Sequence, residues 1–393
     1  MFKVVVGHSD DPDSQSAIES VLEHCLKDLT NILPQAGVLF AAIDFEHALI
    51  LKQIHQVFPN LELIGCTTDG EMSSELGFQQ DSLTLMLFCS DTVQIRAGVG
   101  YETLENPTAA AQQAVQQAMK QENSAEPKLC IALPSSYTAN GSTTSGGAMM
   151  AGLTLALGEQ VPVLGGTAGD QYRFKTTHQF FQTEVLTDAL PILIFSGNIQ
   201  FSYGTACGCT PTEYKGIVTK ALGTVVYEID GKPALEFYRR YLGDRPPTAK
   251  NPLVVYESGV DLPYSPYYMR VPTVSDAELG SVQFLGNVPE QALVQITDIT
   301  SDELIAAAKT SFQTALSRYP GTAPAAVLLF SCCCRRWLLG TRAKEEYQVV
   351  KALATTLPAC GFYTYGEFSP LKPQGKTYYH QETFVTLLIG AES

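Results

Sequence analysis

A four-residue pattern, Thr-x-Gly followed by Asp or Glu, recurs three times after strand-like runs, and this repetition constrains the fold more than any other feature. The copies begin at Thr68, Thr167 and Thr364. Thr68 and Thr167 lie 99 residues apart, whereas Thr167 and Thr364 lie 197 apart, close to twice that interval. Near-regular spacing of equivalent motifs indicates an internal repeat. The doubled interval leaves room for a fourth, decayed copy near residues 264–270.

Each copy lies in the same succession of elements. In the first copy, residues 36–43, 61–65 and 82–89 read as buried strands, and residues 45–58 have apolar side chains at helical spacing. The other copies repeat the order strand, helix, turn, strand, over residues 129–134, 145–158, 161–170 and 190–197 and over residues 325–332, 344–358, 359–370 and 383–390. The sequence therefore predicts an α/β fold of repeated β-α-β units, with mixed sheets flanked by helices.

The repeated turns are the first candidate for a binding site. A tight turn needs glycine, but this need does not explain why each copy also keeps a hydroxyl and a carboxylate at a fixed offset. Loops at the carboxyl ends of strands line the ligand crevice of open α/β sheets. We expect the turns to meet at one pocket between two halves of the chain. There Glu71, Asp170 and Glu367 would raise one another's pKa unless a cation lies among them.

Composition narrows the possible partners. The 393 residues suffice for two or three domains, and the formal net charge of −15 argues against nucleic acid or an anionic membrane as partner. No apolar run is long enough to span a membrane, and the first residues lack a secretory signal. We expect a cytoplasmic protein without membrane insertion. The ten cysteines show no disulfide framework.

Three arginines follow or lie within apolar and aromatic runs. Arg335 and Arg336 come directly after a predicted strand, and Arg270 follows three tyrosines in PYSPYYMR. A guanidinium can bind a carboxylate with two hydrogen bonds. An α-amino acid would thus find arginine for its carboxylate and acidic turns for its ammonium group. A structural salt bridge to one of those acids, or packing between domains, explains the same residues equally simply.

The run SCCCRRW (331–337) suggests thiol chemistry. Adjacent side chains at a strand end point to opposite faces, so we expect that these cysteines do not all bind one tetrahedral metal ion. Cys207-x-Cys209 is also a poor zinc pattern. Two neighbouring arginines would lower the pKa of Cys332 or Cys333, so a thiol-dependent enzyme is one alternative. No G-x-S-x-G, P-loop or HExxH motif is present, and we expect binding without catalysis.

The stretch SSYTANGSTTSGGAMMAG (135–152) is rich in Ser, Thr and Gly between a strand and a helix. A helix N-terminus there can hold an anion, but the stretch lacks the lysine of a nucleotide-binding loop. We expect it to form the rim of the pocket.

Five segments together resemble the signature segments of FIST proteins, which carry an N-terminal and a C-terminal FIST domain. They are IGCTTDGEMS, VLGGTAGD, VVYEIDGKPALEFYRRYLG (225–243), LLFSCCCRRWLLG (328–340) and CGFYTYGEFSP. The resemblance runs in order over nearly the whole chain. It implies a FIST N-terminal domain over residues 1–215 and a FIST C-terminal domain over residues 216–393.

The resemblance also implies a function. FIST domains are sensory, small-ligand-binding modules of bacterial signal transduction; amino acids are a suggested ligand class, and some members are haem-containing nitric oxide sensors. Where relatives often have a His-Gly pair, this chain has Tyr203-Gly204, followed by Cys207 and Cys209, which weakens the haem alternative. The chain ends after its last predicted strand, so we expect it to signal through a separate protein such as a histidine kinase.

The sequence thus predicts a stand-alone sensor of a small polar metabolite such as an amino acid, without catalytic residues, metal ligands or a cofactor, haem being the alternative. The predicted ligand-binding residues are Thr67, Thr68, Gly70, Glu71, Thr167, Gly169, Asp170, Arg270, Cys332, Arg335, Tyr363, Thr364, Gly366 and Glu367.

Overall fold

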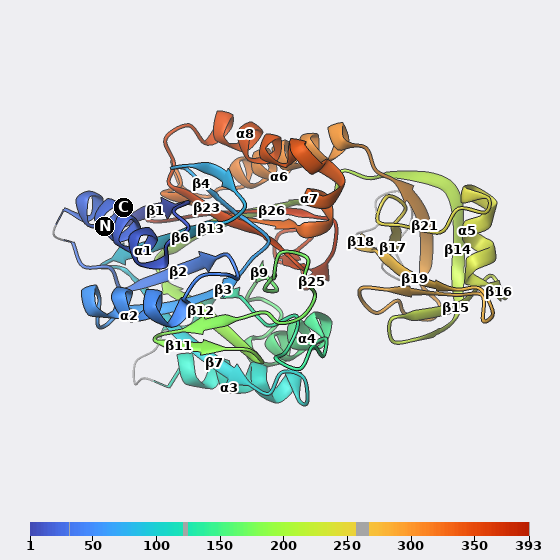
Figure 1. Ribbon diagram of the computed structural model, residues 1–393, viewed down its shortest axis with the longest axis horizontal. Coiled ribbons are helices and arrows are strands. Elements are labelled where there is room, and N and C mark those ends of the chain that lie inside the picture. The colour runs from blue at the N-terminus through green and yellow to red at the C-terminus, as the bar shows by residue number, and fades with distance from the viewer. Residues whose placement is uncertain (31, 121–124, 257–266, 393) are drawn as a thin grey trace.

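The chain folds into a large body and a smaller satellite joined by two short connections (Figure 1). The computed structural model describes residues 1–30, 32–120, 125–256 and 267–392. The satellite runs from Thr210 to Asp298, and the body comprises the other described residues. The predicted mixed α/β fold, with sheets flanked by helices, is confirmed.

Three six-stranded mixed sheets form the body. The first sheet has the order β1 (Phe2–Ser9), β6 (Leu83–Ser90), β2 (Ala36–Ala41), β3 (Glu62–Thr67), β10 (Gln179–Phe181), β11 (Glu184–Leu186). The second has the order β25 (Thr377–His380), β24 (Glu367–Pro370), β9 (Val163–Gly166), β8 (Pro127–Ala132), β12 (Ala189–Gly197), β7 (Val93–Tyr101). The third has the order β13 (Ile199–Ala206), β26 (Phe384–Ala391), β22 (Ala326–Cys332), β23 (Ala359–Thr364), β4 (Glu71–Ser73), β5 (Gly77–Gln79).

The three sheets are built by three repeats that exchange hairpins in a ring. Each repeat contributes four strands to its own sheet and then sends a short hairpin to a neighbouring sheet: β4–β5 pairs with β23, β10–β11 with β3, and β24–β25 with β9. Because every sheet contains strands from two repeats, no repeat can complete its sheet alone.

Residues 359–370, predicted as a turn, are mostly strand. They form β23 and β24, separated only by Tyr365 and Gly366. The Thr-x-Gly motif is therefore the point at which the chain crosses from one sheet to another, in all three repeats. Glycine permits this crossing in the first copy, where Gly70 has a φ of 113°.

The doubled interval between Thr167 and Thr364 does not come from a lost fourth copy of the motif. The satellite is inserted into the third repeat, between β13 and helix α6 (Ser301–Ser317). Residues 267–270, part of the expected fourth copy, form a satellite strand instead, and residues 264–266 lie outside the described part of the chain.

Helices cover the outer face of each sheet of the body. Asp13 caps the first helix, Asn106 and Ser145 cap two others, and Thr300 with Glu303 forms a capping box at α6. Besides α6, the described helices of the body are α1 (Ser14–Leu29, capped by Asp13), α2 (His47–Val57), α3 (Pro107–Ala118, capped by Asn106), α4 (Gly146–Leu157, capped by Ser145), α7 (Cys333–Leu339), the short 3-10 helix η1 (Gly340–Arg342) and α8 (Ala343–Ala354). No helix in the described ranges is long and apolar enough to cross a membrane.

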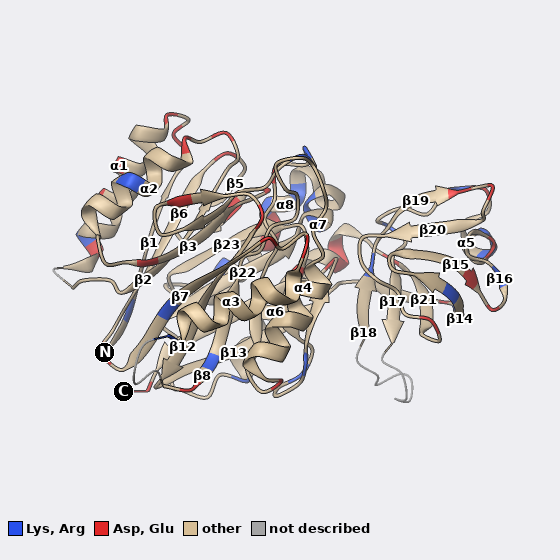
Figure 2. Cartoon of the chain, turned by 90° about the horizontal axis from the view of Figure 1, so that it is seen from below, with Lys and Arg blue, Asp and Glu red and all other residues tan. Residues whose placement is uncertain are grey.

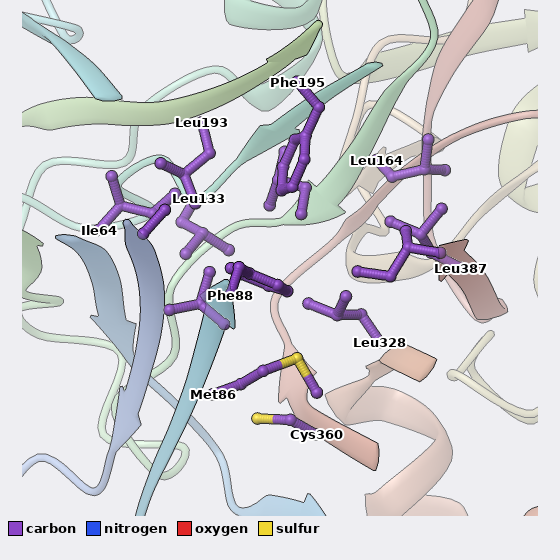
Figure 3. Close-up of a cluster of buried hydrophobic side chains, with 14 of the residues drawn as sticks. Ile64, Met86, Phe88, Leu133, Leu164, Leu193, Phe195, Leu328, Cys360 and Leu387 are labelled. Atoms are coloured by element: carbon purple, nitrogen blue, oxygen red, sulfur yellow. The ribbon is translucent and has the colours of Figure 1, made fainter. Parts of the chain in front are cut away.

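The inner faces of the three sheets meet in one apolar core (Figure 3). The rings of Phe40 and Phe362 lie 4.5 Å apart between the first and third sheets, and those of Phe88 and Phe195 lie 5.6 Å apart between the first and second. Burial of each such side chain stabilises the folded state by about 1.5–3 kcal/mol. The core thus fixes the three motif crossings relative to one another.

The described part of the satellite is an antiparallel sheet with one helix, α5 (Ala234–Leu242). Its strands are β14 (Thr210–Leu222), β15 (Val225–Ile229), β16 (Lys232–Pro233), β17 (Leu253–Tyr256), β18 (Tyr267–Arg270), β19 (Pro272–Asp276), β20 (Ser281–Phe284) and β21 (Leu293–Asp298). It has its own core around Phe237 and Tyr238. Charged residues of both signs lie on the body and on the satellite (Figure 2).

Candidate functional site

The three motif crossings meet inside the body. Backbone hydrogen bonds join each pair of crossings, among them those from Asp69 N to Tyr363 O at 3.0 Å, from Gly169 N to Thr67 O at 2.9 Å, and from Thr167 N to Gly366 O at 2.9 Å. We call this arrangement the crossing ring. The glycines are needed for its close packing, since a Cβ on Gly169 would lie 2.9 Å from the Asp69 carboxylate.

The glutamates of the crossing ring accept hydrogen bonds from hydroxyls of their own motifs. Thr68 Oγ1 donates to the carboxylate of Glu71, and Thr364 Oγ1 donates to that of Glu367 at 2.7 Å. A second hydroxyl completes each site: Ser82 for Glu71 and Thr383 for Glu367. Both carboxyl groups are fully buried, and burial raises the pKa of Glu71 to about 8 and that of Glu367 well above its usual range. In the first and third copies the recurring hydroxyl and carboxylate are thus bonded to each other, whereas Asp170 of the second copy has other partners.

Asp170 and Asp69 hold the loop that follows the second motif. Asp170 accepts hydrogen bonds from Tyr365 Oη and from three successive backbone N–H groups, those of Phe174, Lys175 and Thr176. Asp69 Oδ1 accepts from the backbone of Gln171, and burial raises the pKa of Asp69 to about 7. Within the described ranges its Oδ2 has no partner.

Arg335 forms an internal ion pair. Its guanidinium is fully buried and contacts Glu346, with Nε 2.9 Å from Oε1. Tyr363 Oη and Ser331 Oγ donate to the other oxygen of this carboxylate, and Arg335 Nη2 donates to the Leu304 carbonyl. The ion pair is therefore closed within the third repeat, with Glu346 rather than a motif acid as partner.

A cavity of about 1310 Å³ lies between the body and the satellite. The body contributes the loop between β8 and α4 (135–147), the loop after the second motif, α7, and Tyr365. The satellite contributes residues of β18 and β19, the end of β14 with the turn after it (222–224), and the end of β20 with the loop after it (283–289). Aromatic rings form much of the wall: Tyr137, Tyr172, Phe174, Tyr268, Trp337, Tyr365 and Tyr379.

Arg270 is a charged residue of this wall whose side chain is held in place by stacking and hydrogen bonds. Its side chain is 7% exposed and stacks on the Tyr268 ring at 4.3 Å. Nε donates to the carbonyl of Asn287 at 2.9 Å, and Nη1 donates to those of Met269 and Tyr379 at 2.7 and 3.1 Å. In the described ranges Arg270 forms no salt bridge and Nη2 has no hydrogen-bond partner.

The remaining polar groups of the wall also favour an anion. Among the described residues, the lining includes Arg270 and Lys376 but no Asp or Glu. Gly146 and Gly147, in the first turn of α4, lie on it, and a helix N-terminus attracts negative charge. Thr167 Oγ1 lines the cavity and is buried without a partner in the described part of the chain.

The cysteine run differs from the prediction. Cys332 ends β22 with extended geometry and Cys333 begins α7, so the three consecutive Sγ atoms lie within 4.8 Å of one another. The prediction that they point to opposite faces of a strand is wrong, because the chain turns into a helix after Cys332. Cys333 and Cys334 line the cavity.

The arginines do not lower the pKa values of Cys332 and Cys333. Burial raises the pKa of Cys332, and hydrogen bonding with Cys332 raises that of Cys333. Hydrogen bonds with Cys332 and Cys333 instead lower the pKa of Cys334 to about 7. Arg336 contacts the backbone oxygen of Asp69 and the rings of two aromatic side chains.

A second pair of thiols lies in the first connection between body and satellite. The Sγ atoms of Cys207 and Cys209 are 3.0 Å apart, and Cys209 Sγ lies 3.6 Å from Met269 Sδ. Their mutual hydrogen bond lowers the pKa of Cys207 to about 6. Tyr203, which stands where relatives often have histidine, lines a separate pocket of about 360 Å³. None of the described histidines lines the large cavity.

The predicted site residues thus occupy several places, and Thr167 belongs both to the cavity wall and to the crossing ring. Thr167 and Arg270 line the cavity. Cys332 lies beneath its wall, and Arg335 and Tyr363 serve the Glu346 pair. The others form the crossing ring: Thr67, Thr68, Gly70, Glu71, Gly169, Asp170, Thr364, Gly366 and Glu367. Sequence reasoning missed the satellite loops and Lys376 because no motif marks them, and it passed over Trp337 although the cysteine run SCCCRRW ends there. The aromatic run before Arg270 was the usable signal.

Two domain models of one family match the chain. The FIST N domain matches residues 35–232, and the FIST C domain matches residues 234–370. An uncharacterized protein of Methanocaldococcus jannaschii is 32% identical over 157 residues, which are 39% of this chain and 30% of that protein. An uncharacterized protein of Mycobacterium bovis is 25% identical over 219 residues, 53% of this chain and 56% of that protein. The matches therefore span less than two thirds of these relatives.

Among solved structures, the chain is similar to a cyanuric acid hydrolase from A. caulinodans, with a TM-score of 0.43 and 10% identity over 100% of both chains. A second cyanuric acid hydrolase structure gives a TM-score of 0.38, also with 10% identity and full coverage of both chains. Similarity at this level carries no inference about function.

Proposed function

From the premise that the chain belongs to the FIST family, we propose that it is a sensor whose ligand binds in the cavity between body and satellite. FIST domains are small-ligand sensory modules of signalling. The cavity is concave, walled by aromatic rings and supplied with a few polar groups, as small-molecule sites usually are.

The unpaired Arg270 guanidinium carries this proposal. A buried charge is costly unless an opposite charge and hydrogen bonds compensate it. Among the described residues, the wall supplies carbonyl oxygens to Arg270 but no carboxylate. A ligand with an anionic group would supply the missing charge, and a carboxylate matches a guanidinium in shape as well.

We propose that the ligand is an amino acid or a closely similar small carboxylate. Its carboxylate would lie between Arg270 and the first turn of α4. Because the lining lacks an acidic side chain, an ammonium group would rest against aromatic faces and hydroxyls, where cation–π attraction is worth about 0.5–2 kcal/mol. An aromatic amino acid would use the same rings for its side chain.

Binding in this position can act on the arrangement of body and satellite. The cavity wall comes from both parts, and Arg270 already joins them, since it binds the carbonyl of Asn287 in the satellite and that of Tyr379 in the body. A ligand that contacts both parts shifts the population toward the arrangement it fits. We propose that a separate signalling protein, such as a histidine kinase, reads this change, and that the ligand is bound without turnover.

The test is a thermal-shift panel of amino acids, the corresponding amines and the corresponding amides. We expect stabilisation by compounds with a free carboxylate, of about 2.7 kcal/mol when the ligand concentration is 100 times its Kd. The Arg270→Met variant should lose this effect. The Arg240→Gln variant, which changes an exposed arginine of the satellite, should keep it. Equal stabilisation by amines and amides, or an unchanged shift in Arg270→Met, would contradict the proposal.

A further inference from the structure

We propose that Cys332, Cys333 and Cys334 form a binding site for one thiophilic metal ion, with Zn²⁺ the expected occupant. This inference does not depend on the identity of the cavity's organic ligand.

The geometry of the strand-to-helix junction brings the three ligand atoms together. Cys332 has a φ of −64° and a ψ of 137°, and helical geometry begins with the next residue. The change of direction turns three consecutive side chains to the same side, and their Sγ atoms all lie within 4.8 Å of one another. Zn²⁺ binds thiolates at about 2.3 Å, which requires S–S separations of about 3.8 Å in a tetrahedral site. Small side-chain rotations would satisfy this requirement.

The fourth coordination position would face the cavity. Cys333 and Cys334 line the cavity, whereas Cys332 is 1% exposed and lies beneath them. Zinc sites with three protein ligands keep their fourth position for water or another exchangeable ligand. The cluster therefore has the form of an open rather than a closed zinc site.

A buried acid beside the cluster has no hydrogen-bond partner for its carboxylate in the described part of the chain. This acid, Glu382, is fully buried. It precedes Thr383, whose carbonyl accepts a hydrogen bond from Cys332 N at 3.1 Å. A divalent cation at the three sulfur atoms would offset negative charge at this position. This observation is independent of the distances between the thiols.

Tyr172 holds the first turn of α7 in place. Its hydroxyl donates to the Cys333 carbonyl at 2.8 Å, and its ring lies 5.2 Å from the Arg336 guanidinium. The main chain that carries the sulfur atoms is thus anchored from the cavity side, so the site is partly formed before a metal ion arrives.

The experiment is an anaerobic titration of the reduced, metal-free full chain with Cd²⁺, followed by thiolate-to-metal charge-transfer absorption, and with Zn²⁺ in competition. We expect one equivalent to bind tightly. Cys332→Ser, Cys333→Ser and Cys334→Ser should each weaken binding by at least about 100-fold, because loss of a supporting contact around a metal site already costs 10–100-fold. The matched control is the double variant Cys207→Ser/Cys209→Ser, which leaves the cluster intact and should bind normally.

A second measurement covers variants that fold poorly. In the unmodified chain, bound Zn²⁺ should protect the peptide that contains residues 332–334 from alkylation, as mapped by mass spectrometry. Binding that survives all three single variants, binding that is lost in the Cys207→Ser/Cys209→Ser control, or alkylation of residues 332–334 at an unchanged rate would overturn the metal site. Since no organic ligand is used, none of these results bears on the amino acid proposal.

Discussion

The polar groups of the crossing ring and those of the cavity wall differ in whether they have hydrogen-bond partners. In the crossing ring, Glu71 and Glu367 are sealed by hydroxyls of their own motifs. In the cavity wall, Arg270 and Thr167 have groups without partners in the described ranges. Repetition therefore marks the scaffold of this molecule. The candidate site lies where the repetition is broken, beside the inserted satellite.

Two buried arginines, Arg335 and Arg270, show the same difference between a paired and an unpaired group. Arg335 is paired with Glu346 inside the third repeat, whereas Arg270 binds only backbone carbonyls among the described residues. The first should matter for folding and the second for binding. Substitutions test that division, beginning with the one that should lower stability most.

Arg335→Met should cause the largest loss of stability. It leaves the Glu346 carboxylate buried without its charged partner, and breaking a buried ion pair in this way costs about 3–5 kcal/mol. Urea unfolding followed by circular dichroism measures the change. A free energy of unfolding equal to that of the unmodified chain would show that the pair is not a structural element.

Glu71→Gln should change how stability depends on pH. Burial raises the pKa of Glu71 to about 8 from an ordinary value of 4.5. The protonated group therefore contributes its full stability below about pH 4.5, and this contribution is lost as the pH rises through 8. Glutamine does not titrate, so the variant should gain on the unmodified chain by on the order of 3–4 kcal/mol between pH 5 and 8. If stability changes with pH in the same way for both proteins, the pKa of Glu71 is not raised by burial and the prediction is wrong.

Arg270→Met should lower the stability of the free protein by only about 1–2 kcal/mol. The variant loses hydrogen bonds to backbone carbonyls but also removes a buried charge without a carboxylate partner. The same urea experiment used for Arg335→Met gives a direct comparison. A loss as large as that of Arg335→Met would mean that Arg270 serves mainly as a structural element.

Ser145→Ala should have the smallest effect on stability, about 1 kcal/mol, because it removes the N-cap of α4. Asn106→Ala removes the N-cap of α3 and should cost a similar amount. Of these two helices, α4 begins at the cavity and α3 does not. Ser145→Ala alone should therefore weaken ligand binding in the thermal-shift assay, and equal binding by both variants would remove the α4 N-terminus from the proposed site.

Much of the fold was predictable because local patterns set it. The strands near residues 36–43 and 82–89 and the helices near 45–58 and 145–158 form within a few residues of their predicted bounds. The exchange of hairpins was not predictable, since which sheet a three-residue strand joins depends on packing across the core. Residues 359–370 therefore read as a turn although most of them pair with two different sheets.

The candidate site was harder to predict for a related physical reason. The pattern of hydroxyl, glycine and carboxylate is the same whether it binds a ligand or closes on itself, and only the contact between Thr68 and Glu71 distinguishes the two. The cysteine run was misjudged because its sequence does not show that a helix begins at Cys333. Arg270 could be predicted because a charged residue among aromatic ones is unusual in either setting.

The most direct test of the central claim uses the single tryptophan of the chain, Trp337, which is exposed and lines the cavity. If small carboxylates bind in the cavity, titration with the amino acid panel should give a saturable change of tryptophan fluorescence. The change should be kept in Glu71→Gln and lost in Arg270→Met. The opposite result, loss in Glu71→Gln and retention in Arg270→Met, would place the ligand at the crossing ring and contradict the account.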